Sequence, residues 1–289
     1  MKNKLLISDW VLMGLLGLFY LSFVGYLLPI GSDDLRMTNV FSIDESDIVM
    51  HVWNVYVTDF NLSPSFKYGG VFYLIPVGML HVWSIFFDGS EQAAVIAVRL
   101  YCSLAGVGCL WLTYLLGRLI FQGMVGVLAA YMLGLNPTFL RWAIESHPDL
   151  PQLFFLLISL FFICRYVHRP ILKNLIWASL GAGLAFATKY AGIFLMPVLA
   201  LAVYQSFPSE GWFGRLKLRT IWVHWGVLMG VFCGIFLLTN PSVLTHFTLF
   251  VSSLQSEKEI MAFGHRVRDP ADALLWLQMV VTQVGVVPM

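Results

Sequence analysis

Charged residues are scarce in this chain. Asp, Glu, Lys and Arg make up 11% of its 289 residues, whereas a soluble domain carries about 25%. Hydrophobic residues reach 59% and the formal net charge is only +1. The composition therefore excludes an ordinary soluble domain and predicts a polytopic membrane protein, and the balance of charge gives no indication of nucleic-acid binding.

Cysteines and cofactor motifs are also few. The four cysteines, Cys102, Cys109, Cys164 and Cys233, lie inside or at the end of apolar runs. A thiol in such a place behaves as a small hydrophobic group. There is no Walker-type loop and no dinucleotide fingerprint. We therefore expect no cofactor and no soluble nucleotide donor, and we predict no metal site, although the residues leave a divalent metal open.

Long apolar runs are what the chain has in abundance. A span needs about 20 apolar residues, and the runs are residues 11–30, 93–116, 124–135, 150–163, 175–187, 193–204 and 221–238, with a last one that begins near Ala273 and is cut off at Met289. We predict an all-α transmembrane bundle of about seven full spans plus a truncated eighth, forming one domain over 1–289 that lacks its C-terminal spans.

The apolar stretch 71–87 contains Pro76, Gly78 and His81 and can be read either as a short span or as an interfacial helix. Cytoplasmic segments are enriched in Lys and Arg. If 71–87 does not cross, nine of the 17 basic residues fall on the cytoplasmic side: Lys2, Lys4, Arg118, Arg165, Arg169, Lys173, Arg215, Lys217 and Arg219. The interfacial reading is therefore favoured.

This threading predicts a cytoplasmic N-terminus and three extracytoplasmic loops, 31–92, 139–150 and 240–272, the first of them carrying interfacial helices. The active site would be extracytoplasmic, and a bacterial-type plasma membrane is the expected location. The polar residues of these loops would then meet at one face of the bundle.

Asp44 and Glu45 are the most prominent acids of the first loop. They can be read as the solvated first turn of a helix, where acids are favourable. The alternative is a general base, because an alcohol needs a carboxylate or an imidazole within hydrogen-bond reach to become a good nucleophile.

Two lysines belong to the same predicted face. Lys67, followed by Tyr68, lies in the first loop, and Lys189 separates two short apolar runs. Each can extend its ammonium to the interface, or it can hold a lipid phosphate, for which lysine serves as a point charge.

The segment from Arg141 to Asp149 contains Glu145, His147 and Pro148. It can be a solvated hairpin between helices, with Asp149 near a helix N-terminus. The functional reading makes it a polar wall that binds sugar hydroxyls or assists proton transfer, with His147 tuned near neutral pH.

Several motifs in the right order give the chain a resemblance to a known family. They are Asp44-Glu45, Lys67-Tyr-Gly-Gly70, Ala97-Val-Arg-Leu100, Ser-His-Pro-Asp-x-Pro at 146–151, Gly-Leu-Ala-Phe-Ala-Thr-Lys-Tyr-Ala-Gly at 183–192 and Thr-Asn-Pro at 239–241. Together they resemble the GT-C superfamily of polyprenyl-phosphate-sugar-dependent glycosyltransferases, in particular the protein O-mannosyltransferase and lipid A aminoarabinose transferase group.

The resemblance implies inverting transfer of a sugar from a dolichyl or undecaprenyl phosphate to a hydroxyl of a lipid, glycan or protein. It implies catalytic roles for Asp44, Glu45 and Asp149, with Asp44 as the base. Lys67, Tyr68 and Lys189 would bind the donor phosphate. The functional reading of the polar segment 141–149 adds Arg141, Glu145 and His147 as expected substrate-binding residues. Asp47 departs from the family pattern, because many relatives carry a basic or aromatic residue there.

Two other functions fit the composition. A transporter or flippase for lipid-linked sugars would show ionisable residues near the bilayer midplane and repeated halves, whereas the charges here lie mostly at span ends and no repeat is visible. A non-catalytic, truncated relative is the other alternative.

Overall fold

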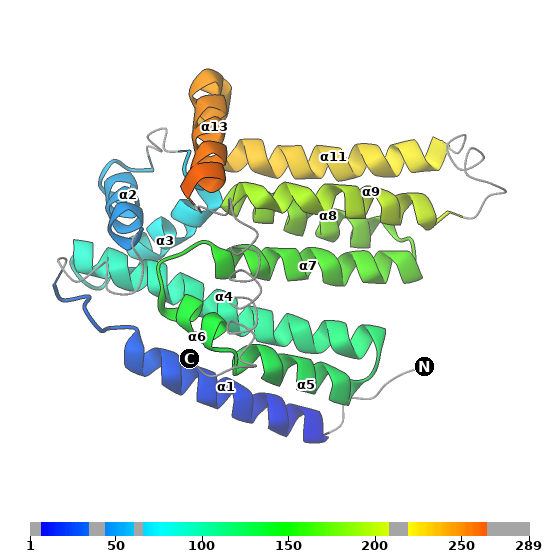
Figure 1. Ribbon diagram of the computed structural model, residues 1–289, viewed down its shortest axis with the longest axis horizontal. Coiled ribbons are helices and arrows are strands. Elements are labelled where there is room, and N and C mark those ends of the chain that lie inside the picture. The colour runs from blue at the N-terminus through cyan, green and yellow to red at the C-terminus, as the bar shows by residue number, and fades with distance from the viewer. Residues whose placement is uncertain (1–6, 35–43, 61–65, 208–218, 265–289) are drawn as a thin grey trace.

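The computed structural model describes residues 7–34, 44–60, 66–207 and 219–264, and every regular element among them is helical (Figure 1). The chain forms α1 (Ile7–Leu27), α2 (Glu45–Val57), α3 (Gly70–Trp83), α4 (Glu91–Ile120), α5 (Gly123–Gly134), α6 (Pro137–Ile144), α7 (Asp149–His168), α8 (Leu172–Thr188), η2 (Tyr190–Phe194), α9 (Leu195–Gln205), α11 (Arg219–Thr239), α12 (Ser242–Thr245) and α13 (Phe247–Gly264). The predicted all-α class is confirmed.

Four of the described helices are long and apolar enough to cross a membrane: α1, α4, α7 and α11. The pair α5–α6 is a fifth if its two helices count as one broken span, since they meet at an angle of 65°. α8 has 17 residues and α9 has 11, short of the roughly 20 that a span needs. The span count of seven therefore stays a prediction, and the eighth run lies outside the described residues.

The long helices lie side by side in one stack (Figure 1). α4 packs on α5 and α7, α7 packs on α8, and α8 packs on α11. Burial follows this order. In α4, 67% of the most apolar 18-residue stretch is buried, whereas only 22% of the corresponding stretch is buried in α1 and in α11. The exposed side of the outer helices carries large apolar residues such as Leu18 and Leu238, as expected for surfaces that face lipid.

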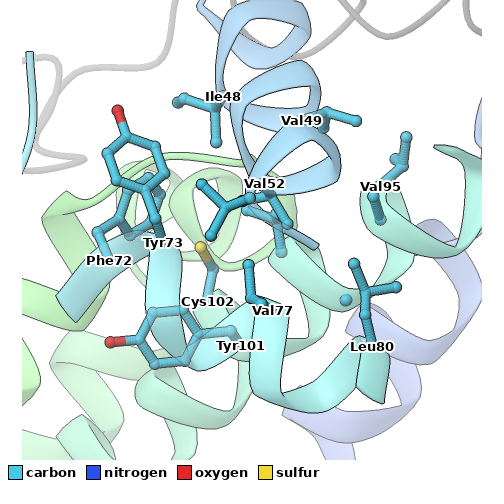
Figure 2. Close-up of a cluster of buried hydrophobic side chains, with 14 of the residues drawn as sticks. Ile48, Val49, Val52, Phe72, Tyr73, Val77, Leu80, Val95, Tyr101 and Cys102 are labelled. Carbon is cyan, nitrogen blue, oxygen red and sulfur yellow. The ribbon is translucent and has the colours of Figure 1, made fainter. Parts of the chain in front are cut away.

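Shorter helices gather at one end of the stack. α2 packs on α3 and α4 through a cluster of buried apolar side chains (Figure 2). Ile48 and Val52 of α2 face Phe72 and Val77 of α3, and Tyr101 of α4 lies in the same cluster. α3 is a 14-residue helix with Pro76 inside it, shorter than the roughly 20 residues that a span needs. This packing fixes the start of α2, where the first acids lie.

The later loop, predicted over 240–272, contains α12 and α13. α13 stands across the end of the stack (Figure 1) and anchors itself by Phe250. The Phe250 ring lies 5.5 Å from those of Phe66 and Tyr190 and 6.0 Å from that of Phe236. α13 therefore packs on the residues next to Lys67 and Lys189.

The loop predicted over 139–150 is helical over most of its length. α6 begins at Pro137, with Asn136 as its N-cap accepting a hydrogen bond from the Phe139 amide. Proline is favoured at the first helical position because its missing N–H has no partner there in any case. The chain therefore turns at Asn136 and resumes as a helix rather than as an open hairpin.

Candidate active site

Asp44 immediately precedes α2, and both of its carboxylate oxygens accept hydrogen bonds. Lys67 Nζ lies 3.0 Å from Oδ1, and the Tyr68 hydroxyl donates to Oδ2 at 3.0 Å. The side chains of Asp44 and Lys67 are 30% and 35% exposed. The predicted base and the predicted phosphate ligand are thus in direct contact at an accessible position.

Glu45 points the other way, into the protein. Its oxygens accept from Arg99 Nε at 2.7 Å and from Arg99 Nη2 at 3.1 Å, and Ser146 Oγ donates to Oε1 at 2.6 Å. Both members of the ion pair are fully buried, which is tolerable only when the charges are paired and hydrogen-bonded. Glu45, for which a catalytic role is predicted, is therefore enclosed by Arg99 and Ser146 rather than accessible.

Arg99 ties four segments together. Its Nη1 donates to the carbonyl oxygens of Leu28 at 2.9 Å and Ile30 at 2.6 Å, just beyond α1. Through Glu45 and Ser146 it also holds the start of α2 and the connection between α6 and α7. No role was predicted for Arg99 or Ser146. The signal was an arginine inside an otherwise apolar run, because such a residue is costly in a membrane unless it is paired.

Asp149, the first residue of α7, forms a second acid–base cluster. Lys189 Nζ lies 2.5 Å from Oδ1, and His147 Nδ1 lies 2.7 Å from Oδ2, an ion pair when the ring is protonated. Lys189 is the C-cap of α8, and its carbonyl accepts from the Gln152 amide at 2.8 Å. The side chain of Asp149 is 21% exposed, so this cluster is more enclosed than the first.

The two clusters adjoin one another. The rings of Tyr68 and His147 meet edge to face with centroids 6.0 Å apart. The Gly69 amide donates to the Thr188 carbonyl at 3.1 Å, which joins the backbone beside Lys67 to the backbone beside Lys189. The structure therefore brings six of the predicted site residues together at one end of the stack: Asp44, Lys67, Tyr68, His147, Asp149 and Lys189.

Arg141 on α6 pairs with Glu145, the C-cap of that helix, four residues further on. The Arg141 side chain is 67% exposed, whereas that of Glu145 is 5% exposed. Burial raises the pKa of Glu145 above its ordinary value, although Arg141 opposes the shift. The structure thus places both residues at the edge of the site, with Glu145 next to Ser146.

Asp44 and Tyr68 differ in their protonation state at neutral pH. Partial burial opposes ionisation of Asp44, but the hydrogen bonds from Lys67 and Tyr68 and the charge of Lys67 outweigh it and lower the pKa of that carboxyl. Burial, reinforced by the Asp44 charge, raises the pKa of Tyr68 above its usual value. At neutral pH Asp44 is therefore ionised while Tyr68 keeps the proton that it donates. Over the part of the chain that the structure describes, no group of three His, Cys, Asp or Glu side chains is placed to hold a metal ion.

Fold and site together define a polytopic helical membrane protein with an acid–lysine site at one end of its bundle. Residues 79–239, 161 of the 289, match the family of dolichyl-phosphate-mannose-protein mannosyltransferases. The chain therefore belongs to that family, which is of the GT-C type, and this membership supports a membrane mannosyltransferase. No curated protein and no solved structure matches the chain. The matched range contains Arg99, Asp149 and Lys189 but begins after Asp44 and Lys67.

Proposed function

We propose that the protein transfers a sugar, mannose in the first instance, from a polyprenyl phosphate to an acceptor hydroxyl at this end of the bundle. The observation that carries the proposal is the joined pair of clusters, in which two accessible carboxylates each contact a lysine. A phosphodiester donor needs cations, and an acceptor hydroxyl needs a base. The site offers both within one hydrogen-bonded patch.

In the proposed reaction Asp44 takes the proton of the acceptor hydroxyl. The acceptor oxygen then forms a bond to the anomeric carbon of the sugar as the bond from that carbon to the phosphate oxygen breaks. The electron pair leaves with the lipid phosphate, which departs as a phosphomonoester. A single displacement of this kind inverts the anomeric configuration.

The lysines stabilise the leaving group. Negative charge grows on the phosphate as the bond breaks, and cations already in place lower the energy of that state. Lys67 and Lys189 lie on segments joined by the backbone hydrogen bond from Gly69 to Thr188, so their backbones are held in register. Asp149 holds Lys189 in place and also contacts His147.

Replacing Asp44 with asparagine tests this assignment. A general base contributes about 10²- to 10⁴-fold to a rate, so we expect Asp44→Asn to lower turnover by that factor. The measurement is transfer of labelled mannose from dolichyl-phosphate mannose in proteoliposomes, with a peptide rich in serine and threonine as acceptor.

Asp88→Asn is the matched control. It removes the same charge from an exposed position in the connection between α3 and α4, and its turnover should equal that of the wild type. Asp44→Asn should still bind the donor, and quenching of tryptophan fluorescence measures that binding. Undiminished turnover in that variant would remove Asp44 from the mechanism.

A further inference from the structure

The end of the stack opposite the candidate site is basic. There the turn between α7 and α8 (Figure 1) carries four basic residues within nine positions, all of them exposed: Arg165, His168, Arg169 and Lys173. The sequence has no Asp or Glu from residue 150 to residue 209. Over the residues that the structure describes, no carboxylate forms an ion pair with Arg165, Arg169 or Lys173. These cations therefore have no anionic partner within the described protein.

The length of α7 sets the depth of this turn in a membrane. The helix begins with Asp149 at the candidate site and has 20 residues. At 1.5 Å per residue it is about 30 Å long, the thickness of the hydrocarbon core of a bilayer. Arg165 lies in the last turn of α7, and Lys173 is the second residue of α8. Both cations therefore lie at the level of the lipid headgroups, in the leaflet opposite the candidate site.

A pair of stacked rings joins the two helices beside these cations. The rings of Phe162 on α7 and Trp177 on α8 have centroids 5.8 Å apart and planes inclined by 22°. Phe162 precedes Arg165 by three residues, and Trp177 follows Lys173 by four. Residues three or four apart share a helix face. The two cations therefore lie on the face that carries the stacked rings.

Arg165 is held against the rings of its own helix. Its guanidinium lies 5.7 Å from the centroid of the Phe161 ring and 6.0 Å from that of the Phe162 ring, within the range of a cation–π contact. Trp177 is 42% exposed, so the stacked rings are open to lipid on one side. The face thus offers a positioned cation, a second cation and an apolar surface next to them.

We propose that this face binds one anionic phospholipid of the leaflet opposite the candidate site. Arg165 and Lys173 bind the phosphate of the headgroup, and the acyl chains lie along the stacked rings of Phe162 and Trp177. Arginine binds phosphate through two parallel hydrogen bonds, and lysine binds it as a point charge. A phospholipid is the anion present at this depth, and basic pockets between transmembrane helices are suited to anionic headgroups.

A solvated row of charges would look different. The general excess of Lys and Arg on one side of a membrane protein needs only their number. Here Arg165 lies over aromatic rings, and the ring pair beside it is shared by two helices. Binding at such a face should depend on which cations are present, whereas attraction by the total charge of this end should not.

Quenching of Trp177 fluorescence by brominated lipids measures which lipid lies at this face. The full chain is reconstituted in phosphatidylcholine bilayers that contain either brominated phosphatidylglycerol or brominated phosphatidylcholine. Each measurement is repeated with Trp177→Phe, which keeps an aromatic ring and allows the signal of the other tryptophans to be subtracted. One Lys or Arg near the surface raises affinity for anionic lipid about fivefold, so two cations should give a preference for phosphatidylglycerol of about 25-fold.

Arg165→Gln and Lys173→Gln should each lower this preference to about fivefold, and the double variant should abolish it. Arg118→Gln is the matched control. It removes one positive charge from the same end of the stack, where Arg118 hydrogen-bonds with Tyr114, and it should keep the wild-type preference. Melting temperatures in detergent verify that each variant is folded. Lys173 is exposed, so its variant serves as the test if Arg165→Gln does not fold.

Three results would overturn the proposal. Equal quenching of wild-type Trp177 by the two brominated lipids would show that no anionic lipid is selected there. An equal loss of preference in Arg118→Gln and Lys173→Gln would assign the preference to the total charge of this end. Soluble glycerol phosphate in excess should not compete, because it lacks the acyl chains that would contact the rings, and full competition would identify a phosphate site rather than a lipid site.

Discussion

Asp44 and Glu45 are adjacent in the sequence, but the Asp44 side chain is accessible and the Glu45 side chain is buried. Successive residues at the start of a helix point about 100° apart, so only one of the two can face the core. Arg99 decides which, because its buried guanidinium needs the Glu45 carboxylate. Asp44 is thereby directed to Lys67 and to the accessible side.

This division could be predicted only in part from the sequence. The acid pair, Lys67 and Lys189 are visible as charges in an apolar chain, and topology placed them on one face. Their pairing partners depend on the rotation of α2 and α4 about their axes, which composition does not specify. The buried pair of Glu45 and Arg99 was therefore missed, although the position of Arg99 in an apolar run pointed to a partner.

Replacing Arg99 with leucine should lower the stability of the protein more than any substitution in the accessible pair of Asp44 and Lys67. The variant leaves Glu45 charged and buried without a counterion, which costs about 3–5 kcal/mol. We expect a marked fall in melting temperature in detergent. The double variant Glu45→Leu with Arg99→Leu removes both charges and should regain much of the loss. Equal losses in the single and double variants would contradict the role of the pair.

The start of α3 shows how elements hold the site. The Gly70 amide donates to Asn240 Oδ1 at 2.6 Å, and the Gly69 amide donates to the Thr188 carbonyl. The N-terminus of α3 thus wedges between the ends of α8 and α11. Glycine is required because a Cβ at either position would lie 2.0 Å from a backbone oxygen, that of Ala187 or of Thr239.

Gly69→Ala and Gly70→Ala should therefore be destabilising. The clash is with backbone rather than with a movable side chain, and overpacking costs about 1–3 kcal/mol. Thermal unfolding in detergent measures it. Gly226→Ala is the matched control on α11, where a Cβ meets nothing within 4 Å, and it should leave the melting temperature unchanged or slightly raised. Similar losses in all three variants would contradict the wedge.

The spacing Gly226, Gly230, Gly234 is typical of close helix packing, but a Cβ at these positions would meet no atom of the described residues within 4 Å. The described helices therefore do not pack on this stripe of α11. Asn136-Pro137 marks the break between α5 and α6, which meet at an angle of 65°.

At the scale of the whole molecule, the residues of the candidate site come from the ends of several helices. α2 begins at the site, α8 ends there, and α7 begins there, so an up-and-down stack delivers Asp44, Asp149 and Lys189 to one end (Figure 1). This arrangement could be predicted from the sequence because it follows from the direction of the spans. The angles between helices could not, because they depend on side-chain packing.

Labelling with a membrane-impermeant maleimide tests the predicted orientation. Cysteine is introduced at Thr245, exposed at the site end, or at Lys173, exposed at the start of α8. The background replaces Cys164 and Cys233 with alanine, while Cys102 and Cys109 are buried. We expect intact cells to label the Thr245→Cys variant, and the Lys173→Cys variant only after permeabilisation. The reverse pattern would place the site in the cytoplasm.

The buried guanidinium of Arg99 also bears on the order in which the bundle assembles. α4 has 30 residues, more than the roughly 20 that span a bilayer, and Arg99 lies in its first third. An unpaired arginine at the centre of a span costs about 2.5–3.5 kcal/mol at insertion. We therefore expect nascent α4 to settle with Arg99 near the lipid headgroups, and arrival of Glu45 on α2 to draw it into the protein. Formation of the Arg99–Glu45 pair would then be a late step in the assembly of the bundle, and that step would position Asp44.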